Sequence, residues 1–500
     1  LVVPRSAPTG LGGLEASLQG PAANNPREKH RSDDHDPHAE EDAYYDATDE
    51  SEPKVVYDNE ENGNQQYTEK DQSKAAGKGP QGVSGTGMKQ TLAQKLVARA
   101  AGRSSVTPGE IVTCKVDLAM IHDSSGPRRV KPMLERLGAR VWDPSKVVLI
   151  SDHYVPAYDE ESRSIIRITR DWAREAGIGS FHDEQGICHV VLPERGHLRP
   201  GLFAVGGDSH SPTGGAFAAY MFGVGATEML GVLVTGEIWL KVPHTIAMEF
   251  DGAFAPGVSA KDAMLFLIGR FGLDGGQYQA VEYRGAAIRK LPMQERMTLC
   301  NMAAELGAQT GLISSDETTS AYLGRECEIW DSDSDAPLLA HHRFDAGALA
   351  PQVAAPHSPA NSRPVTEFGG VRPQLAYIGA CTGAKLEDLR MAARVLAGRR
   401  SAIPLLVAPA SLRDQQTAEK EGTLQVLLDA GAQLLPNACG ICAGYGEHLL
   451  PENMVAISST ARNFKGRMGA ASSQVYLASP FTVAASAVAG AIRDPREMLQ

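Results

Sequence analysis

Three cysteines lie in loops of small residues, Cys381 in IGACTGAK and Cys439 with Cys442 in ACGICAG. Thiolates at the CxxC spacing can hold one metal ion or two corners of an iron–sulfur cluster, and small neighbours let the backbone approach the inorganic sulfides. A disulfide, a structural zinc ion and a redox dithiol are alternatives for the same pair. Zinc would need a fourth ligand, and His448 stands six residues past Cys442, an unusual spacing. A redox dithiol would usually stand alone at the head of a helix, without Cys381.

Histidines lie at the ends of three apolar runs, as Asp152–His153, His189 and Asp208–Ser209–His210. A single histidine in such a place is usually a core residue with its hydrogen bonds satisfied. Three in equivalent positions, two of them beside Asp, indicate acid–base chemistry, because a neighbouring carboxylate holds the tautomer of an imidazole and stabilises its charged form. Glu282 in AVEYRG is a further candidate carboxylate, although alone it would be interpreted as a surface strand residue.

An alternation of short apolar runs and amphipathic helices must position these residues. Apolar runs predict strands within 146–156, 189–194, 201–207, 373–380 and 402–411, and helical spacing predicts helices within 89–102, 216–236 and 384–398. This order indicates an α/β fold with largely parallel sheets, in which sites lie outside the carboxyl ends of the strands. Residues 344–365 are rich in Pro and Ala and predict a linker between the lobes 88–343 and 366–500.

The charge of the chain is unevenly placed. Of the net charge of −12, residues 1–87 carry −9, and they have almost no apolar periodicity. We therefore expect this segment to be disordered and Met88 to be a plausible start. No apolar run is long enough for a transmembrane helix, and no stripe of Lys and Arg indicates a nucleic-acid surface. Seven scattered cysteines argue against a disulfide framework and for a reducing compartment, which predicts a cytoplasmic location.

Five motifs spread over residues 88–500 occur together: GGDSHSPTGGAFAAYMFGVGATEM, RMTLCNMAAELGAQTGLISSDETT, IGACTGAKLEDL, ACGICAG and SSTARNFKGRMG. Together they resemble the aconitase superfamily, and most closely its branch of 3-isopropylmalate dehydratase and homoaconitase large subunits. The resemblance implies an aconitase-like fold, with several three-layer α/β lobes around an iron–sulfur cluster and without the swivelling domain of single-chain aconitases.

The resemblance also implies roles for single residues. It implies one [4Fe–4S] cluster per subunit, held by Cys381, Cys439 and Cys442, with one iron left open as a Lewis acid. Asp152–His153 is similar to the family pair that protonates the departing hydroxyl. The remaining residues whose roles the resemblance implies are His189, Asp208 and His210 around substrate and water, Glu282 as a further acid, and Ser209, Arg462 and Arg467 for substrate binding.

By the same resemblance, a separate small swivel-domain subunit supplies a serine base, and the substrate is a di- or tricarboxylate. The implied reaction is the dehydration and rehydration of a 2-alkylmalate-type acid, with 3-isopropylmalate of leucine biosynthesis first and another substituted malate or homoaconitate as the alternative. Gly383, Ala384 and Ala461 depart from the usual family residues and thin the polar surroundings of the cluster. A cluster-bearing regulatory module and a zinc-stabilised structural protein are the alternatives from other classes.

Overall fold

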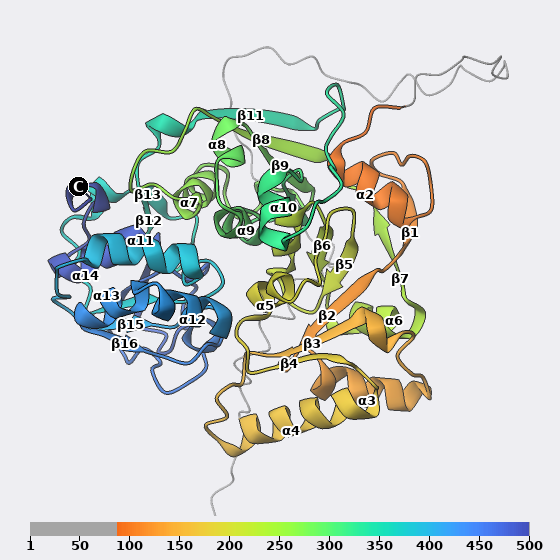
Figure 1. The fold of residues 1–500 in the computed structure, drawn as a ribbon, viewed down its shortest axis with the longest axis horizontal. Coiled ribbons are helices and arrows are strands. Elements are labelled where there is room, and N and C mark those ends of the chain that lie inside the picture. The colour runs from red at the N-terminus through yellow and green to blue at the C-terminus, as the bar shows by residue number, and fades with distance from the viewer. Residues whose placement is uncertain (1–87, 500) are drawn as a thin grey trace, which may run out of the picture. The chain divides into compact units, whose positions relative to one another are not determined.

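The computed structural model describes residues 88–499, which all belong to one unit, Tyr67–Gln500. The acidic segment predicted to be disordered lies outside the described residues. Three α/β sheets and one two-stranded ribbon make up the described chain (Figure 1). No helix among the described residues is long and apolar enough to cross a membrane.

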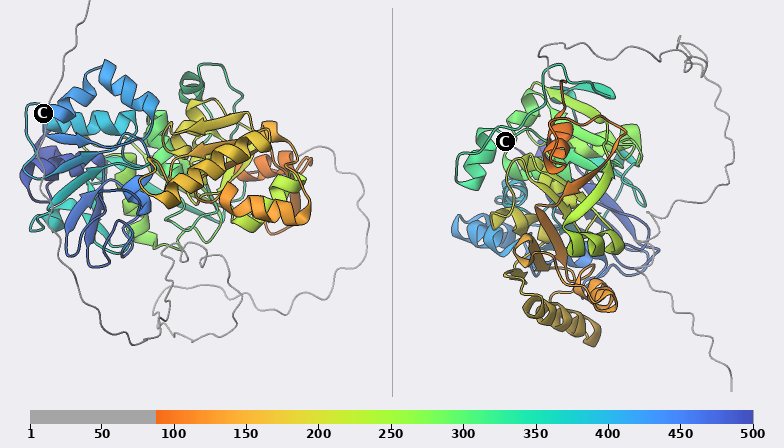
Figure 2. Two further views of the ribbon diagram at one scale, coloured as in Figure 1. Left: turned by 90° about the horizontal axis from the view of Figure 1, so that it is seen from below. Right: turned by 90° about the vertical axis from the view of Figure 1, so that its right-hand side faces the viewer.

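The first lobe is a five-stranded parallel sheet in the order β4-β3-β2-β5-β6. Its central strands are buried along their whole length, as expected for a parallel sheet covered on both faces. Helices α3, α4 and α6 pack beside it, and Figure 2 shows the long gold helix α4 along this lobe. The elements of the lobe are α2 (Leu92–Ala100), β2 (Leu118–His122), α3 (Pro127–Leu137), η1 (Pro144–Lys146), β3 (Val147–Ser151), α4 (Glu160–Glu175), β4 (Ser180–Asp183), α5 (Cys188–Glu194), β5 (Phe203–Gly206), η2 (Ser211–Phe217), β6 (Tyr220–Gly223) and α6 (Ala226–Thr235), with the ribbon of β1 (Ile111–Lys115) and β7 (Glu237–Lys241).

Two predictions for this lobe were wrong. Residues 189–194, predicted as a strand, lie in helix α5, because a short apolar run buried on all sides has no periodicity that separates helix from strand. Residues 216–236, predicted as one helix, contain the end of η2, then strand β6 and then helix α6. Strand β6 occupies the edge of the sheet beside β5, a position that local propensity does not reveal.

The second lobe is a four-stranded parallel sheet in the order β10-β9-β8-β11. It approaches the first lobe very closely at η2, where a Cβ built on Gly215 would lie 1.6 Å from the carbonyl oxygen of Gly311. Only glycine fits there, which brings the loop after His210 directly against β10. The elements are β8 (Thr245–Asp251), α7 (Ala260–Phe271), β9 (Ala280–Arg284), α8 (Ala286–Arg289), α9 (Met293–Asn301), β10 (Thr310–Leu312), α10 (Glu317–Leu323), β11 (Ala340–Asp345) and η3 (Ala346–Ala348).

The third lobe is a seven-stranded mixed sheet in the order β13-β12-β18-β17-β14-β15-β16. The region 344–365, predicted as a linker, contributes β12 and β13 to this sheet, with β12 antiparallel to β18. The Pro-rich composition agrees with an antiparallel edge as well as with a connection. The elements are β12 (Gln352–Ala354), β13 (Ser362–Pro364), η4 (Val365–Phe368), β14 (Leu375–Ile378), α11 (Leu386–Leu396), β15 (Leu405–Val407), α12 (Leu412–Lys420), α13 (Thr423–Asp429), β16 (Ala432–Leu434), η5 (Gly440–Ala443), β17 (Val455–Ser458), β18 (Gln474–Ala478), α14 (Pro480–Ala489) and η6 (Pro495–Glu497).

Backbone hydrogen bonds join the first and third lobes next to α5. The amide of Ile187 donates to the carbonyl of Ala410 at 2.8 Å, and the amide of Leu412 donates to the carbonyl of Gln185 at 3.0 Å. A β-bridge between Gly186 and Ser411 lies between them. The turn that leads into α5, and therefore into His189, is held by a strand-like pairing with the third lobe.

Candidate active site

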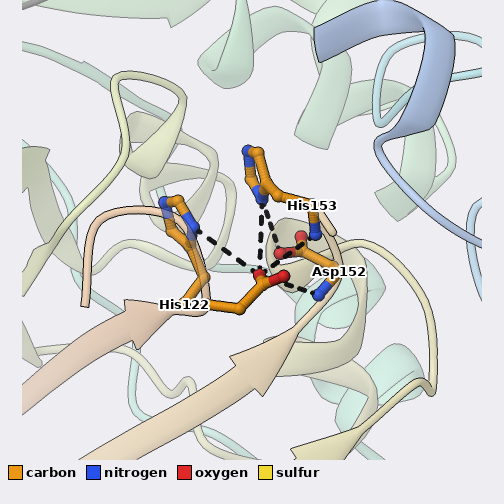
Figure 3. A group of neighbouring side chains, drawn as sticks. His122, Asp152 and His153 are labelled. Carbon is orange, nitrogen blue, oxygen red and sulfur yellow. Dashed lines mark hydrogen bonds and ion pairs between the residues drawn. The ribbon is translucent and has the colours of Figure 1, made fainter. Parts of the chain in front are cut away.

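Strands β2 and β3 end side by side, and their carboxyl ends carry the first group of polar side chains (Figure 3). His153 Nδ1 and Asp152 Oδ1 are 2.7 Å apart. Burial alone lowers the pKa of His153, but the charge and hydrogen bond of Asp152 outweigh it and raise the pKa to about 10. Burial likewise raises the pKa of Asp152, but the charge of His153 outweighs it and holds the pKa at about 2. The pair is therefore a carboxylate and a protonated imidazolium near neutral pH.

His122, at the end of β2, completes this group and was not among the predicted site residues. Its ring stacks on that of His153 at 4.1 Å with an interplanar angle of 14°. Burial first, and then the charge of His153, lower the pKa of His122. A neutral imidazole therefore lies on a charged one, the arrangement needed for a proton acceptor beside a proton donor.

Asp123 holds the loop that carries the pair. Its Oδ1 accepts from the backbone amides of Asp152 and His153 at 3.1 Å each, and its Oδ2 accepts from the amide of Tyr154 at 2.7 Å. The side chain is fully buried. Asp123 therefore fixes the backbone of residues 152–154, a role that its place after His122 in the sequence did not reveal.

Asp208 joins the first group to a second one. Its Oδ1 accepts from His189 Nε2 at 2.6 Å and from the backbone amide of His210 at 2.7 Å. Its Oδ2 lies 3.9 Å from the Nε2 atoms of both His122 and His153. Burial raises the pKa of Asp208, but the neighbouring histidines outweigh it and hold the pKa well below its usual range. The predicted Asp152, His153, His189, Asp208 and His210 thus form one connected cluster, with half-buried Ser209 between the last two.

Glu305 is the carboxylate that the structure adds to this cluster. Its Oε1 accepts from His210 Nε2 at 2.8 Å and from Arg462 Nε at 2.7 Å. Burial raises the pKa of Glu305, but His210 and Arg462 outweigh it and hold the pKa at about 2. The motif RMTLCNMAAELGAQTG contains this residue, so the quoted motif could have drawn attention to it.

Glu282, predicted as the further acid, does not join the cluster. Its Oε1 accepts from Arg284 Nε at 2.6 Å, and its Oε2 accepts from Ser332 Oγ at 2.7 Å. It lies on β9 with its side chain buried. Both carboxylate oxygens are engaged away from the histidines, and Glu305 takes the place that Glu282 was predicted to fill.

The three predicted cysteines lie in the third lobe beside the histidine cluster. Cys381 follows β14, and Cys439 and Cys442 flank the start of η5. The amide of Cys439 donates to the carbonyl of Asp152 at 2.8 Å, which ties the CxxC loop to the acid of the first lobe. Asn301 Nδ2 lies 3.2 Å from Cys381 Sγ and donates to it. Seven cysteines are free, so the disulfide alternative is wrong for this structure.

Cations surround the thiol of Cys442. A hydrogen bond with Cys439 and the charges of Arg467, His210 and Arg462 lower its pKa to about 6, against the effect of burial. Burial and the neighbouring Cys442 raise the pKa of Cys381 to about 12 in the absence of a bound cation. His448, the possible fourth zinc ligand, is half-buried, and its Nε2 lies 3.4 Å from the Nε2 of Gln433.

A family model decides the relationship of this chain to known proteins. The model for the aconitase family, described as aconitate hydratase, matches residues 92–373 and 366–490. The chain belongs to the aconitase family.

The curated relatives of this aconitase-family chain agree. It is 44% identical over 419 residues to 3-isopropylmalate dehydratase large subunit 1 of Methanopyrus kandleri, a match that covers 82% of this chain and 100% of that protein. It is 42% identical to the probable methanogen homoaconitase large subunit of Methanothermobacter thermautotrophicus, over 82% of this chain and 98% of that protein. The 3-isopropylmalate dehydratase large subunit of a Sulfurihydrogenibium species is 41% identical, over 82% and 97%.

Two of the departures from the usual family residues have a packing reason in this aconitase-family chain. A Cβ on Gly383 would lie 2.2 Å from Ser459 Oγ, which itself donates to the carbonyls of Gly379 and Gly383. Ser459 thereby occupies the space that a larger residue would need. Ala384 is fully buried, and its carbonyl accepts from the amide of Ala410 at 2.8 Å. Nothing in the structure explains Ala461.

Proposed function

We propose that this chain is the large subunit of an iron–sulfur hydro-lyase that dehydrates and rehydrates a 2-alkylmalate-type acid, with 3-isopropylmalate as the first candidate. The observation that carries the proposal is the single connected cluster of acid–base groups, joined through Asp208, beside the two loops that hold Cys381, Cys439 and Cys442. The hydroxy tricarboxylate that loses water to give homoaconitate is the second candidate substrate, because relatives named homoaconitase large subunit are as similar as those named dehydratase.

The cysteine set fits a [4Fe–4S] cluster, one per chain. Groups of three or more ligand atoms within 4.8 Å of one another occur twice among the described residues, and neither group contains a cysteine. The three thiols therefore do not converge on a single ion, whereas a cluster needs ligands spread around several irons. The charges of Arg467 and Arg462 favour the thiolate form of Cys442, which a cluster requires of its ligands. When bound, such a cluster supplies a Lewis-acid iron for the hydroxyl and a carboxylate of the substrate.

The chain's own residues account for proton movement. His153, held charged by Asp152, donates a proton from Nε2 to the departing hydroxyl. The low pKa of stacked His122 keeps that ring neutral, so it can accept a hydrogen bond beside the donor. His189 and His210, both bound to Asp208, orient the water and the substrate hydroxyl.

Arg462 and Arg467 bind the substrate carboxylates. Glu305 holds Arg462 through its Nε at 2.7 Å, which fixes the plane of the guanidinium. A planar, pre-oriented guanidinium suits bidentate binding of a carboxylate. Two arginines suit the two carboxylates of a substituted malate.

A small swivel-domain subunit is the proposed partner and supplies the serine base. The relatives of this chain are named large subunits, which implies a small subunit as the partner. Free cysteines fit a reducing compartment, and we propose the cytoplasm.

The test combines the chain with its cognate small subunit after anaerobic reconstitution with iron and sulfide. Formation of the unsaturated acid from 3-isopropylmalate, followed by its ultraviolet absorbance, is the expected result. If the hydroxy tricarboxylate that gives homoaconitate is turned over at least tenfold faster than 3-isopropylmalate, the second candidate is the substrate. A reconstituted complex that binds four irons yet dehydrates neither acid would refute the proposal.

A further inference from the structure

Lys261, the second residue of α7, is a buried lysine that the proposed chemistry does not use. Its side chain is 1% exposed. Its Nζ donates to the carbonyls of Ser459 at 2.5 Å and Thr460 at 2.6 Å, and to Thr382 Oγ1 at 3.1 Å. Thr382 follows Cys381 directly, and the two carbonyls lead into the loop of Arg462. One ammonium of the second lobe therefore ties together two loops of the third.

The ammonium of Lys261 has no carboxylate partner among the described residues. All of its hydrogen-bond acceptors are neutral oxygens. Lys385, at the other side of the same cysteine loop, is buried as deeply but forms an ion pair with Asp388 Oδ2 at 2.6 Å. Burying a charge without a counter-charge costs several kcal/mol, so a buried cation usually faces an anion.

Asp388 and the two cysteines Cys442 and Cys381 are the acidic groups that act on Lys261. Burial lowers the pKa of Lys261 to about 8, and Asp388, Cys442 and Cys381 act against that fall while Lys385 adds to it. Asp388 is already paired with Lys385, which leaves the thiolate group as the counter-charge that Lys261 lacks. Three thiolates carrying an iron–sulfur cluster are anionic as a unit.

We propose that Lys261 is a positioning residue for the loop of Cys381 and the loop of Arg462, and the fixed positive counter-charge of the iron–sulfur cluster. The inference rests on the proposed function, since it needs a cluster at Cys381, Cys439 and Cys442. Lys261 acts through backbone and threonine oxygens, to which its ammonium donates, and not through hydrogen bonds to the thiols themselves. It sets the electrostatic potential of the cluster and holds the two loops at a constant separation.

The test is the midpoint potential of the cluster in reconstituted Lys261→Gln, measured by redox titration with electron paramagnetic resonance. Glutamine keeps two hydrogen-bond donors and removes the charge. Loss of a nearby positive charge makes the cluster harder to reduce, so the potential is expected to fall below that of the wild type. The matched control is Thr382→Val, which removes the two hydrogen bonds of the threonine hydroxyl, one from Lys261 and one to the carbonyl of Ser459, and no charge. Its potential is expected to be unchanged.

Iron release to a chelator is the second measurement and serves if Lys261→Gln loads poorly. The variant is expected to lose iron about tenfold to 100-fold faster, the usual effect of removing an outer partner of a metal site. Lys261→Arg keeps the charge and is expected to restore both the potential and the rate. Equal potentials in wild type and Lys261→Gln, or equal shifts in Lys261→Gln and Thr382→Val, would overturn the proposal. A wild-type chain that takes up no cluster would instead refute the proposed function.

Discussion

The two halves of the candidate site are stabilised in different ways. The histidine half carries its own counter-charges, because Asp152, Asp208 and Glu305 each pair with at least one histidine at 2.6 to 2.8 Å. In the cysteine half, burial raises the pKa of Cys381 to about 12. A hydrogen bond with Cys439 and the nearby charges of Arg467, His210 and Arg462 lower the pKa of Cys442 to about 6. The histidine half therefore holds its charges in pairs within the chain, whereas the cysteine half places cations beside thiols that we propose hold an iron–sulfur cluster.

The largest expected effect is on the cysteine half. Changing Cys381, Cys439 or Cys442 to Ser should each abolish iron binding and all turnover, because a hydroxyl is a poor substitute for a thiolate on iron. The measurement is iron and sulfide per chain after anaerobic reconstitution. The control is Cys327→Ser, because Cys327 is half-buried and does not belong to either loop of the three cysteines. This variant should keep the full iron content. Stoichiometric zinc without sulfide in the wild type would contradict the prediction.

A smaller effect is expected in the histidine half, because removing an acid leaves the metal in place. His153→Ala in the complex with the small subunit should lower kcat by about 10² to 10⁴ without changing the iron count. His182→Ala is the control, since His182 contacts His197 at 2.7 Å and no residue of the cluster. Loss of iron in His153→Ala would show that the two halves are not independent.

Glu282 was the further acid predicted from the sequence, whereas Glu305 is the carboxylate that the structure joins to His210 and Arg462. Substituting each of them therefore tests which one belongs to the site. Glu305→Gln should lower kcat/KM by about tenfold to 100-fold, since it weakens the hold on both His210 and Arg462. Glu282→Gln leaves the half-buried Arg284 without its ion pair, so it should lower Tm while the activity per folded molecule stays near that of the wild type. The opposite ranking in activity would restore Glu282 as the further acid.

The smallest expected effect is a pH dependence of stability. The pKa of His153 is raised from 6.5 to about 10, so its contribution is complete below pH 6.5 and disappears as pH rises through 10. The pKa of Asp152 is lowered from 3.8 to about 2, so its contribution is complete above pH 3.8 and disappears as pH falls through 2. The free energy of unfolding lost in Asp152→Asn should therefore be largest between pH 4 and 6.5. A loss that is constant from pH 5 to 10 would contradict the charged pair.

The sequence predicted the parts of the site that local motifs encode. These parts are the cysteine loops, the pair Asp152–His153 and the group Asp208 to His210. In each of them, the residues that act together also lie close together in the sequence. His122, Asp123 and Glu305 were missed because their partners are far along the chain, as in Glu305 with Arg462, 157 residues away. The strand predicted at 189–194 was wrong because only the tertiary contacts decide between a short helix and a strand. For the same reason the Pro-rich composition of 344–365 did not indicate the strands β12 and β13 within it.

The pairing of residues 185–187 with residues 410–412 has a consequence for how the protein is made. The bridge joins Gly186 to Ser411, so the turn before His189 leaves the ribosome some 225 residues before its partner. At typical synthesis speeds of about 5 to 20 residues per second, that delay is about 10 to 45 s. During this interval the parallel sheet of the first lobe can form while the turn into α5 lacks its final support. A nascent chain arrested between these positions should therefore contain the folded sheet of the first lobe, while the turn before His189 lacks its pairing with residues 410–412. We expect chaperones to bind such a chain.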